Sequence, residues 1–315
     1  MSPRQRAQPA GPTARRRGTA TGSTTVTTAL LRRWPLPAID GAQGKESRGR
    51  VLVVGGSEQI PGGVILAATA ALRAGAGKLE IATSRSVAPW VAVAVPEARV
   101  VGLRQDRHGE LAAGACHGLC QDAAACDAVL IGPGMMNGRA GTELIQECVR
   151  EANGPALVVD ASPLAAFAGG RRFKRRASSR LILTPHAGEM ASLWGIEKAA
   201  VLSAPLEVAR QAALRLDATV VLKGQETFIV APDGTAFRNT AGNDGLGTSG
   251  SGDVLAGIIA GLCARGADTV QAAVWGVYLH ARAGDALAAR HGRDGLLARE
   301  LANEVPPLLA RLAVR

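Results

Sequence analysis

The sequence predicts an α/β fold in which helices cover both faces of a mainly parallel central sheet. Short, continuous apolar runs such as Val51–Val54 and Ala128–Ile131 alternate with Ala-rich stretches of helical length. Strands that are buried on both faces have such runs, and their alternation with helices is typical of parallel sheets with right-handed crossovers. The 315 residues can form one large domain or two small ones. We expect a single three-layer domain over residues 24–315.

The predicted strands follow one another along the whole of this domain. They are Val51–Val54, Leu79–Ala82, Ala128–Ile131, Ala156–Val159, Leu181–Leu183, Thr219–Leu222 and Thr227–Ala231. The last two lie on either side of a short turn, so we expect them to form an antiparallel hairpin at the edge of the sheet. Helices are predicted for the segment after Thr24, which Pro35 ends, for Val64–Gly75, and for a segment that begins near Asp253.

The charge of the chain is concentrated near its start. The formal net charge is +10, and residues 1–50 contribute +8 of it. Residues 1–23 are rich in Arg, Pro, Gly and Thr, so we predict a disordered basic tail. A transit peptide and a weak nucleic-acid contact through Arg15–Arg17 remain alternatives. Residues 51–315 are nearly neutral, which argues against a nucleic-acid-binding surface over the whole domain.

The composition also indicates the compartment. No run of about 20 apolar residues is present, so no transmembrane helix is predicted, and no signal peptide is evident. The five cysteines are odd in number, and their spacing fits no usual zinc pattern. We therefore expect reduced cysteines that mostly fill the core, in a cytoplasmic protein.

Special residues follow the predicted strands repeatedly. The segments concerned are Gly55-Gly56-Ser57 with Pro61-Gly62-Gly63, Gly132-Pro133-Gly134, Asp160, Thr184-Pro185-His186 and Lys223-Gly224. The carboxyl ends of parallel strands meet at one edge of a sheet, and ligands bind there in α/β folds. The sequence therefore predicts an active-site rim at this edge.

The segment Asn243–Asp253 (NDGLGTSGSGD) precedes an apolar helix. A turn rich in Gly and Ser that leads into a helix N-terminus offers free backbone N–H groups and the positive end of the helix dipole, which suits phosphate. The carboxylate of Asp253 can either cap the helix or accept a proton from an attacking hydroxyl. The P-loop motif GxxxxGK[ST] is not present.

Four further features have two interpretations each. His186 can line the rim or pack on the surface, and Lys223 can bind a nucleotide or extend its amine to solvent as a structural residue. Asp160 can bind a metal or cap the next turn. The basic run Arg171–Arg176 lies between rim loops and is either solvated or attracts a polyanionic dinucleotide.

Several segments together resemble one family, the ADP-dependent NAD(P)H-hydrate dehydratases, a branch of the ribokinase-like superfamily. The resemblance covers residues 24–312 and is carried by GRVLVVGGSEQIPGG (49–63), AALRAGAGKLEIAT (70–83), LIGPGM (130–135), LVVDASPL (157–164), LTPHAGEM (183–190), VVLKGQET (220–227), the stretch 242–253 ending in GSGD, and GVYLHARAGD (276–285). GSGD alone indicates only a ribokinase-like phosphate site, whereas the combination in this order is much more specific.

The resemblance implies a metabolite-repair lyase of ribokinase-like fold. Such an enzyme removes water from the S form of NAD(P)H hydrate at the expense of ADP, releasing AMP and phosphate. In this sequence Asp253 matches the catalytic position that also contacts the hydrate, and Gly252 matches the nucleotide anion hole. The segment Lys223, Gly224, Gln225, Glu226 and Thr227 matches the adenine nucleotide loop, and Gly63, Gly134 and His186 match positions that line the hydrate pocket.

The resemblance also implies a metal ion, an oligomeric state and a partner enzyme, and two other functions remain as alternatives. Mg²⁺, a homotetramer in the cytoplasm and a separate epimerase that supplies the S hydrate are expected, although no metal ligands are identified. The alternatives are a ribokinase-like kinase of a small alcohol, such as hydroxymethyl-pyrimidine or hydroxyethyl-thiazole, and a nucleotide sensor without turnover. The segments at 184–190 and 223–227 favour the dehydratase, and Asp253 argues against the sensor.

Overall fold

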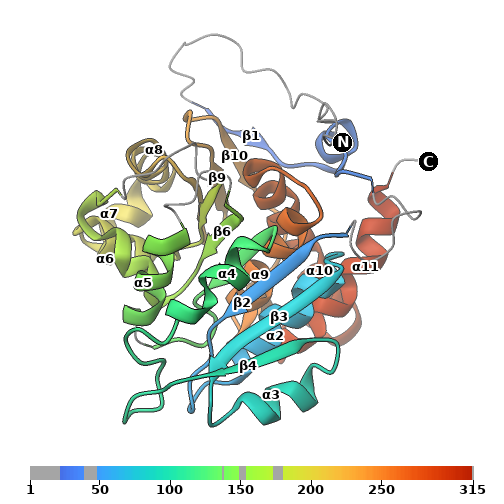
Figure 1. Cartoon of the computed structure of the whole chain (residues 1–315). Helices are drawn as coiled ribbons and strands as arrows, with labels where there is room; N and C mark the ends of the chain where they lie inside the picture. Colours follow the sequence, from blue (N-terminus) through green and yellow to red (C-terminus); the bar gives the residue numbers. More distant parts are fainter. Residues whose placement is uncertain (1–21, 39–47, 137, 149–153, 173–179, 314–315) are drawn as a thin grey trace, which may run out of the picture.

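A computed structural model describes residues 22–38, 48–136, 138–148, 154–172 and 180–313. Within these ranges one ten-stranded sheet has the order β1-β10-β9-β8-β7-β6-β5-β2-β3-β4 (Figure 1). The strands are β1 (Thr24–Thr25), β2 (Arg50–Val54), β3 (Lys78–Ser84), β4 (Arg99–Leu103), β5 (Ala128–Ile131), β6 (Ala156–Val159), β7 (Leu181–Leu183), β8 (Thr219–Leu222), β9 (Thr227–Val230) and β10 (Ala236–Asn239). The predicted tail lies outside the described residues except for positions 22 and 23.

The seven strands from β4 across to β8 are parallel, as predicted. β8 and β9 form the predicted antiparallel hairpin, but its expected place at the sheet edge is wrong, because β10 and the short β1 extend the sheet beyond it. Three strands, β1, β4 and β10, were not predicted from the sequence. β4 is a partly exposed edge strand with Arg99 and Gly102 in it, so it lacks the continuous apolar run of a central strand.

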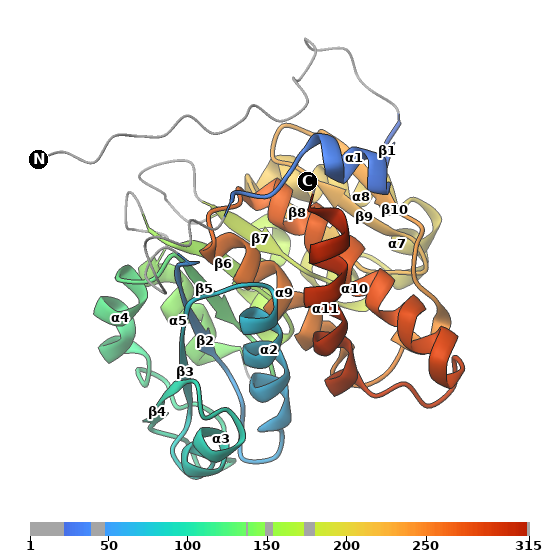
Figure 2. The same ribbon diagram turned by 90° about the vertical axis from the view of Figure 1, so that its right-hand side faces the viewer.

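Helices cover both faces of the sheet, which confirms the three-layer prediction. The helices are α1 (Thr28–Arg33), α2 (Gly62–Arg73), α3 (Ala88–Ala94), α4 (Cys120–Ala124), α5 (Arg139–Cys148), α6 (Ala187–Trp194), α7 (Lys198–Ser203), α8 (Pro205–Leu216), α9 (Ser251–Ala264), α10 (Thr269–His291) and α11 (Ala298–Leu312), with 3₁₀ segments η2 (His117–Leu119), η3 (Ser162–Gly170) and η4 (Asp244–Leu246). Residues alternate along β2: Val51 and Val53 belong to the buried cluster that includes residues of α2, α9, α10 and α11, whereas Leu52 and Val54 belong to a second cluster with residues of α5, α6 and α8. Figure 2 shows α2, α9, α10 and α11 on one side of the sheet and α4 and α5 on the other.

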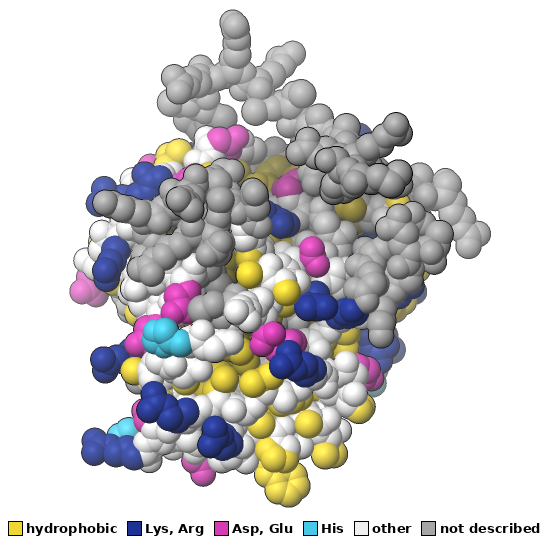
Figure 3. Space-filling view, in the orientation of Figure 1, with side chains coloured by type: hydrophobic (Ala, Val, Ile, Leu, Met, Phe, Trp, Pro, Cys, Tyr) yellow, Lys and Arg dark blue, Asp and Glu magenta, His cyan; other side chains and the backbone are white. Residues whose placement is uncertain are grey.

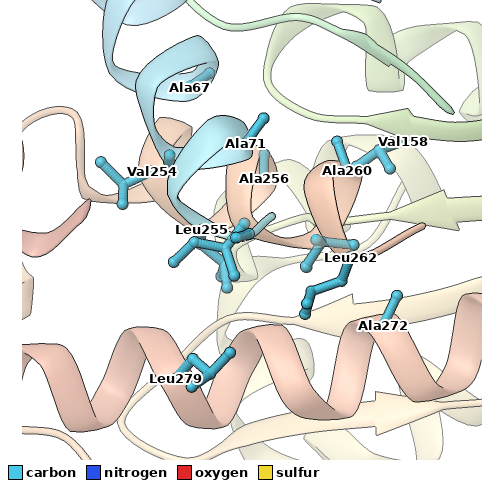
Figure 4. Close-up of a cluster of buried hydrophobic side chains, with 14 of the residues drawn as sticks. Ala67, Ala71, Val158, Val254, Leu255, Ala256, Ala260, Leu262, Ala272 and Leu279 are labelled. Carbon is cyan, nitrogen blue, oxygen red and sulfur yellow. The ribbon is translucent and has the colours of Figure 1, made fainter. Parts of the chain in front are cut away.

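Two glycines bring α9 very close to α2. A Cβ atom on Gly257 would lie 2.1 Å from the carbonyl oxygen of Ala67, and one on Gly261 would lie 2.3 Å from that of Ala71. Small side chains from both helices fill this contact, and Leu279 of α10 lies on the far side of α9 (Figure 4). The packing buries most of α9 and fixes the direction in which its N-terminus points.

No helix in the described ranges is long and apolar enough to cross a lipid bilayer. Cys116, Cys126 and Cys263 are buried, as expected for cysteines that fill the core. Burial raises the pKa of the Cys126 and Cys263 thiols to about 12, so both remain protonated at neutral pH.

Candidate active site

Three polar side chains meet where β6, β7 and β8 end. Asp160 follows β6, Thr184 follows β7, and Lys223 follows β8. Asp160 Oδ1 lies 2.8 Å from Lys223 Nζ and accepts a 2.6 Å hydrogen bond from the Thr184 hydroxyl. These contacts confirm that the predicted rim loops converge, and they give Asp160 an ion-pair partner rather than the turn-capping role that the sequence left open.

Lys223 remains a cation in this setting. Desolvation lowers the pKa of its ammonium group, but the carboxylates of Asp160 and Glu189 outweigh this, so the pKa is raised on balance. Glu189 Oε2 lies 3.8 Å from Nζ. The backbone N–H of Lys223 also donates to Pro185 O at 2.8 Å, which ties β8 to the β7 loop. A fixed positive charge therefore lies at this edge, where an anionic ligand would gain most from it.

The Gly-rich segment leads into the N-terminus of α9 beside this charge. Gly250 is the N-cap, with the left-handed φ of +87° that glycine favours, and no side chain caps the helix. The first N–H to bond within the helix is that of Val254, which donates to Gly250 O, so the N–H groups of Gly252 and Asp253 have no acceptor within the helix. A Cβ atom on Gly252 would lie 3.4 Å from Lys223 Nζ. The helix N-terminus and the cation thus face the same space.

Asp253 is the third residue of α9, so the capping alternative is wrong and its carboxylate is available for other contacts. Burial, followed by the charge of Asp160, raises the pKa of Asp253 to about 6, against the opposing effects of Lys223 and of a hydrogen bond from the Gly134 backbone. A carboxylate with this pKa is mostly ionised at neutral pH and is a stronger base than an ordinary aspartate.

Gly63 and Gly134 bring two loops into contact beside Asp253. A Cβ atom on Gly63 would lie 2.5 Å from the backbone nitrogen of Gly134, and one on Gly134 would lie 2.4 Å from the carbonyl oxygen of Ile60. Gly134 also has a φ of +68°. Both positions therefore require glycine in this backbone arrangement, and the structure brings both of these sequence-predicted residues to the rim.

His186 has a structural contact that the sequence did not predict. It is the N-cap of α6, where its Nδ1 atom accepts from the N–H groups of Gly188 and Glu189, and Glu189 in turn accepts from the His186 N–H. The side chain is still 58% exposed. In the neutral ring, the tautomer with Nδ1 as acceptor carries its hydrogen on Nε2. Nε2 lies 3.6 Å from Glu189 Oε1, so His186 caps α6 and faces the carboxylate that also lies near Lys223.

Of the remaining predicted positions, the turn after Lys223 lies at the rim, whereas the described part of the basic run does not. Gly224, Gln225 and Glu226 form the exposed turn between β8 and β9, next to Lys223. Arg171 and Arg172, the described part of the basic run, line a surface pocket with Trp194 and Arg215, near the start of β8. These two residues therefore lie away from the rim, because η3 carries the chain back toward the amino ends of the strands.

Sequence reasoning gave no role to several residues that contact the Gly-rich segment. His280 Nε2 lies 3.0 Å from the hydroxyl of Ser251, and Asp285 accepts from the Gly242 backbone and the Asn243 side chain. Both belong to the segment GVYLHARAGD of α10. The sequence signal that could have revealed them is a histidine and an aspartate five residues apart within a largely apolar helix.

Sequence relatives of this chain are named for the dehydration or repair of NAD(P)H hydrate. The family model described as NAD(P)H-hydrate dehydratase matches residues 51–307. An ADP-dependent (S)-NAD(P)H-hydrate dehydratase from Xanthomonas campestris is 49% identical over 91% of this chain and 96% of its own length. A bifunctional NAD(P)H-hydrate repair enzyme from Moorella thermoacetica is 40% identical over 90% of this chain, which spans 54% of that relative.

Solved structures agree with the sequence relatives. The ADP/ATP-dependent NAD(P)H-hydrate dehydratase from Bacillus subtilis, co-crystallised with ATP and Mg²⁺, has a TM-score of 0.79 and 30% identity over 93% of this chain and all of its own. A hydroxyethylthiazole kinase from Pyrococcus horikoshii has a TM-score of 0.56 at 16% identity, covering 86% of this chain and 93% of its own, which shows a shared fold alone. On the family match and the identity to the X. campestris relative, this chain belongs to the NAD(P)H-hydrate dehydratase family.

Proposed function

We propose that this protein dehydrates the S form of NAD(P)H hydrate with ADP as co-substrate, restoring NAD(P)H and releasing AMP and phosphate. The observation that carries the proposal is the 49% identity to the X. campestris dehydratase across almost the full length of that enzyme. A carboxylate beside an open helix N-terminus and a lysine supports it, because this chemistry needs a base next to a phosphate site.

Asp253 is the proposed catalytic base. It accepts the proton of the C6 hydroxyl of the hydrate as that oxygen attacks the β-phosphorus of ADP, and the bond to the α-phosphate breaks to release AMP. Phosphate is a better leaving group than hydroxide. The ring nitrogen then pushes out the C6 phosphate while a proton leaves C5, which restores the ring double bond.

The other predicted positions bind and orient the two substrates. The N–H groups at Gly252 and the ammonium of Lys223 hold the phosphates, where they offset the charge that develops on transfer. The turn from Gly224 to Thr227 holds the nucleoside. Gly63, Gly134 and His186 line the hydrate pocket beside Asp253, so the reacting hydroxyl lies next to the base.

Mg²⁺ is part of this proposal. No group of three or more His, Cys, Asp or Glu side chains able to hold a metal occurs among the described residues. Magnesium at nucleotide sites is usually held by substrate phosphates, waters and one or two carboxylates, and the buried Asp160 fits such a set. Bound there, the ion would neutralise phosphate charge during transfer.

Assembly, location and partners also remain predictions. We expect a homotetramer in the cytoplasm that receives the S hydrate from a separate epimerase. The bifunctional description of the M. thermoacetica relative supports a link between the two repair steps. Size-exclusion chromatography with light scattering tests the tetramer, since a monomer at working concentration would contradict it.

The deciding experiment measures recovery of NAD(P)H absorbance from purified S hydrate with ADP, with ATP or without nucleotide. We expect recovery with ADP, and one AMP and one phosphate for each NAD(P)H formed. The alternative, a kinase of a small alcohol, would instead yield a phosphorylated alcohol and leave the hydrate unchanged. The identity to named dehydratases does not favour that alternative.

A further inference from the structure

One face of α10 contacts the Gly-rich segment at its beginning, middle and end. At the beginning, Asp285 Oδ2 accepts from the Gly242 N–H and Oδ1 accepts from the Asn243 side chain, both at 3.3 Å. In the middle, Leu246 packs where a Cβ atom on Gly284 would come within 2.6 Å of it. At the end, His280 Nε2 meets the Ser251 hydroxyl at 3.0 Å.

The spacing along the helix explains how α10 makes all three contacts. His280 and Gly284 are four residues apart, so they are stacked on one face, and Asp285 lies directly beside them. α10 has 23 residues, and most of its first two-thirds is buried. A long, packed helix provides a rigid surface for a segment whose glycines give it little stiffness of its own.

The contact at Ser251 acts on the proposed reaction site. Ser251 is the first residue of α9 and immediately precedes Gly252 and Asp253. The hydrogen bond from α10 therefore sets the position of the first helical turn, and with it the two N–H groups and the carboxylate. Burial lowers the pKa of His280 to about 4, so this bond is made by a neutral ring at physiological pH.

We propose that His280 and Asp285 are positioning residues that hold the Gly242–Asp253 segment in its phosphate-binding form before the nucleotide arrives. His280 acts through Ser251, and Asp285 acts through Gly242 and Asn243. This inference rests on the proposed function, in which that segment binds the phosphates of ADP. Groups that are placed before binding cost no reorganisation when charge develops.

The test compares variants on both sides of the bond. His280→Leu and Ser251→Ala each remove it, while His280→Gln places an amide where Nε2 was. The matched control is Gln271→Leu, which removes buried hydrogen bonds from the same helix to Trp34 and Pro35, far along the helix from the site. We expect the first two variants to lower kcat/KM for ADP by about 10- to 100-fold. The double variant His280→Leu/Ser251→Ala should lose no more kcat/KM than either single variant, because both remove the same bond. His280→Gln should retain most of the wild-type kcat/KM.

A further readout, amide hydrogen exchange, separates positioning from general stability. Amide hydrogen exchange across 242–253 should become faster in His280→Leu and Asp285→Ala, and stay unchanged in Gln271→Leu. The inference is overturned if folded His280→Leu and Ser251→Ala keep wild-type constants, or if Gln271→Leu loses as much activity as they do. If His280→Leu does not fold, the kinetics of Ser251→Ala test the inference, because this variant removes the same hydrogen bond.

Calorimetry of ADP binding distinguishes a failure of this inference from a failure of the proposed function. A wild-type protein that binds ADP but restores no NAD(P)H would contradict the function, and the inference would then be judged on ADP affinity in the same variants. A wild-type protein that binds no ADP would contradict the function and the inference together, whereas unchanged ADP affinity and kinetics in folded His280→Leu and Ser251→Ala would overturn the inference alone.

Discussion

At the scale of single residues, Asp253 is subject to opposing electrostatic effects. Burial and the charge of Asp160 make its ionisation more costly, whereas Lys223 and the Gly134 backbone make it easier. The outcome is a pKa of about 6, which gives a base that is ionised at neutral pH yet holds a proton more tightly than a solvated aspartate. Neither neighbouring charge is close to Asp253 in sequence.

Replacing Asp253 by Asn should abolish most turnover while leaving ADP binding nearly unchanged. The amide keeps the shape of the side chain but cannot accept the hydroxyl proton, so kcat should fall by about 10²–10⁴-fold. Steady-state kinetics and calorimetry measure the two effects separately. Asp233→Asn, at an exposed position in the β9–β10 turn, is the control and should behave as wild type. An active Asp253→Asn enzyme would refute the assignment of the base.

The pH dependence of kcat/KM should show the raised pKa directly. The base acts only when ionised, and its pKa in the free enzyme is about 6 rather than near 4. Activity should therefore be complete well above pH 6 and decline as the pH falls through about 6. A profile that stays level down to pH 5 would contradict the assignment of this limb to Asp253.

At the scale of elements, the contact between α2 and α9 determines where the helix N-terminus points. The two helices approach so closely at Gly257 and Gly261 that the carbonyl oxygens of Ala67 and Ala71 lie against glycine Cα atoms. A larger residue at either position would have to push the helices apart. The N-terminal end of α9, which we propose binds phosphate, would move with them.

Gly257→Ala should therefore destabilise the protein. The added methyl group would lie 2.1 Å from a backbone oxygen, and overpacking of this kind costs about 1–3 kcal/mol. Gly62→Ala is the matched control in α2, because a Cβ atom there meets no atom within 4 Å. Denaturant unfolding of both variants measures the difference. Equal midpoints for the two would show that the helices can separate without cost.

At the scale of the whole molecule, most of the net positive charge lies in the first 50 residues, away from the residues that the proposed reaction uses. Lys, Arg, Asp and Glu side chains are interspersed on the face shown in Figure 3, in keeping with a body that is nearly neutral outside its first 50 residues. The charges that the proposed reaction uses are local ones at the carboxyl edge of the sheet. The first strand and helix nonetheless belong to the folded body, because Leu31 is fully buried and Thr28 bonds to Tyr278 at 2.7 Å.

Two truncations should separate the tail from this body. Removal of residues 1–21 should leave both melting temperature and activity unchanged. Removal of residues 1–33 also removes Leu31 and its neighbours, which should cost at least about 2 kcal/mol of stability. Thermal unfolding measures both. A large loss of activity in the shorter truncation would assign a function to the tail.

The sequence by itself determined the layered α/β fold, most of the central strands and the chain order of the rim segments. A strand buried on both faces needs a continuous apolar run, and that requirement is visible locally. Edge strands such as β4 lack this apolar run, because their polar side chains can remain in contact with solvent. The roles predicted for Asp253 and its glycine neighbours came from the family resemblance, which a short continuous segment can carry without knowledge of the fold.

Only the tertiary structure decided which distant groups meet. The Asp160–Lys223 pair, the contact between Gly63 and Gly134, and the bond from His280 to Ser251 join residues that are 63, 71 and 29 positions apart. No local pattern encodes such pairs, because they depend on strand order and on the angle at which helices pack. The raised pKa of Asp253 and the shape of the Gly242–Asp253 segment are consequences of that packing.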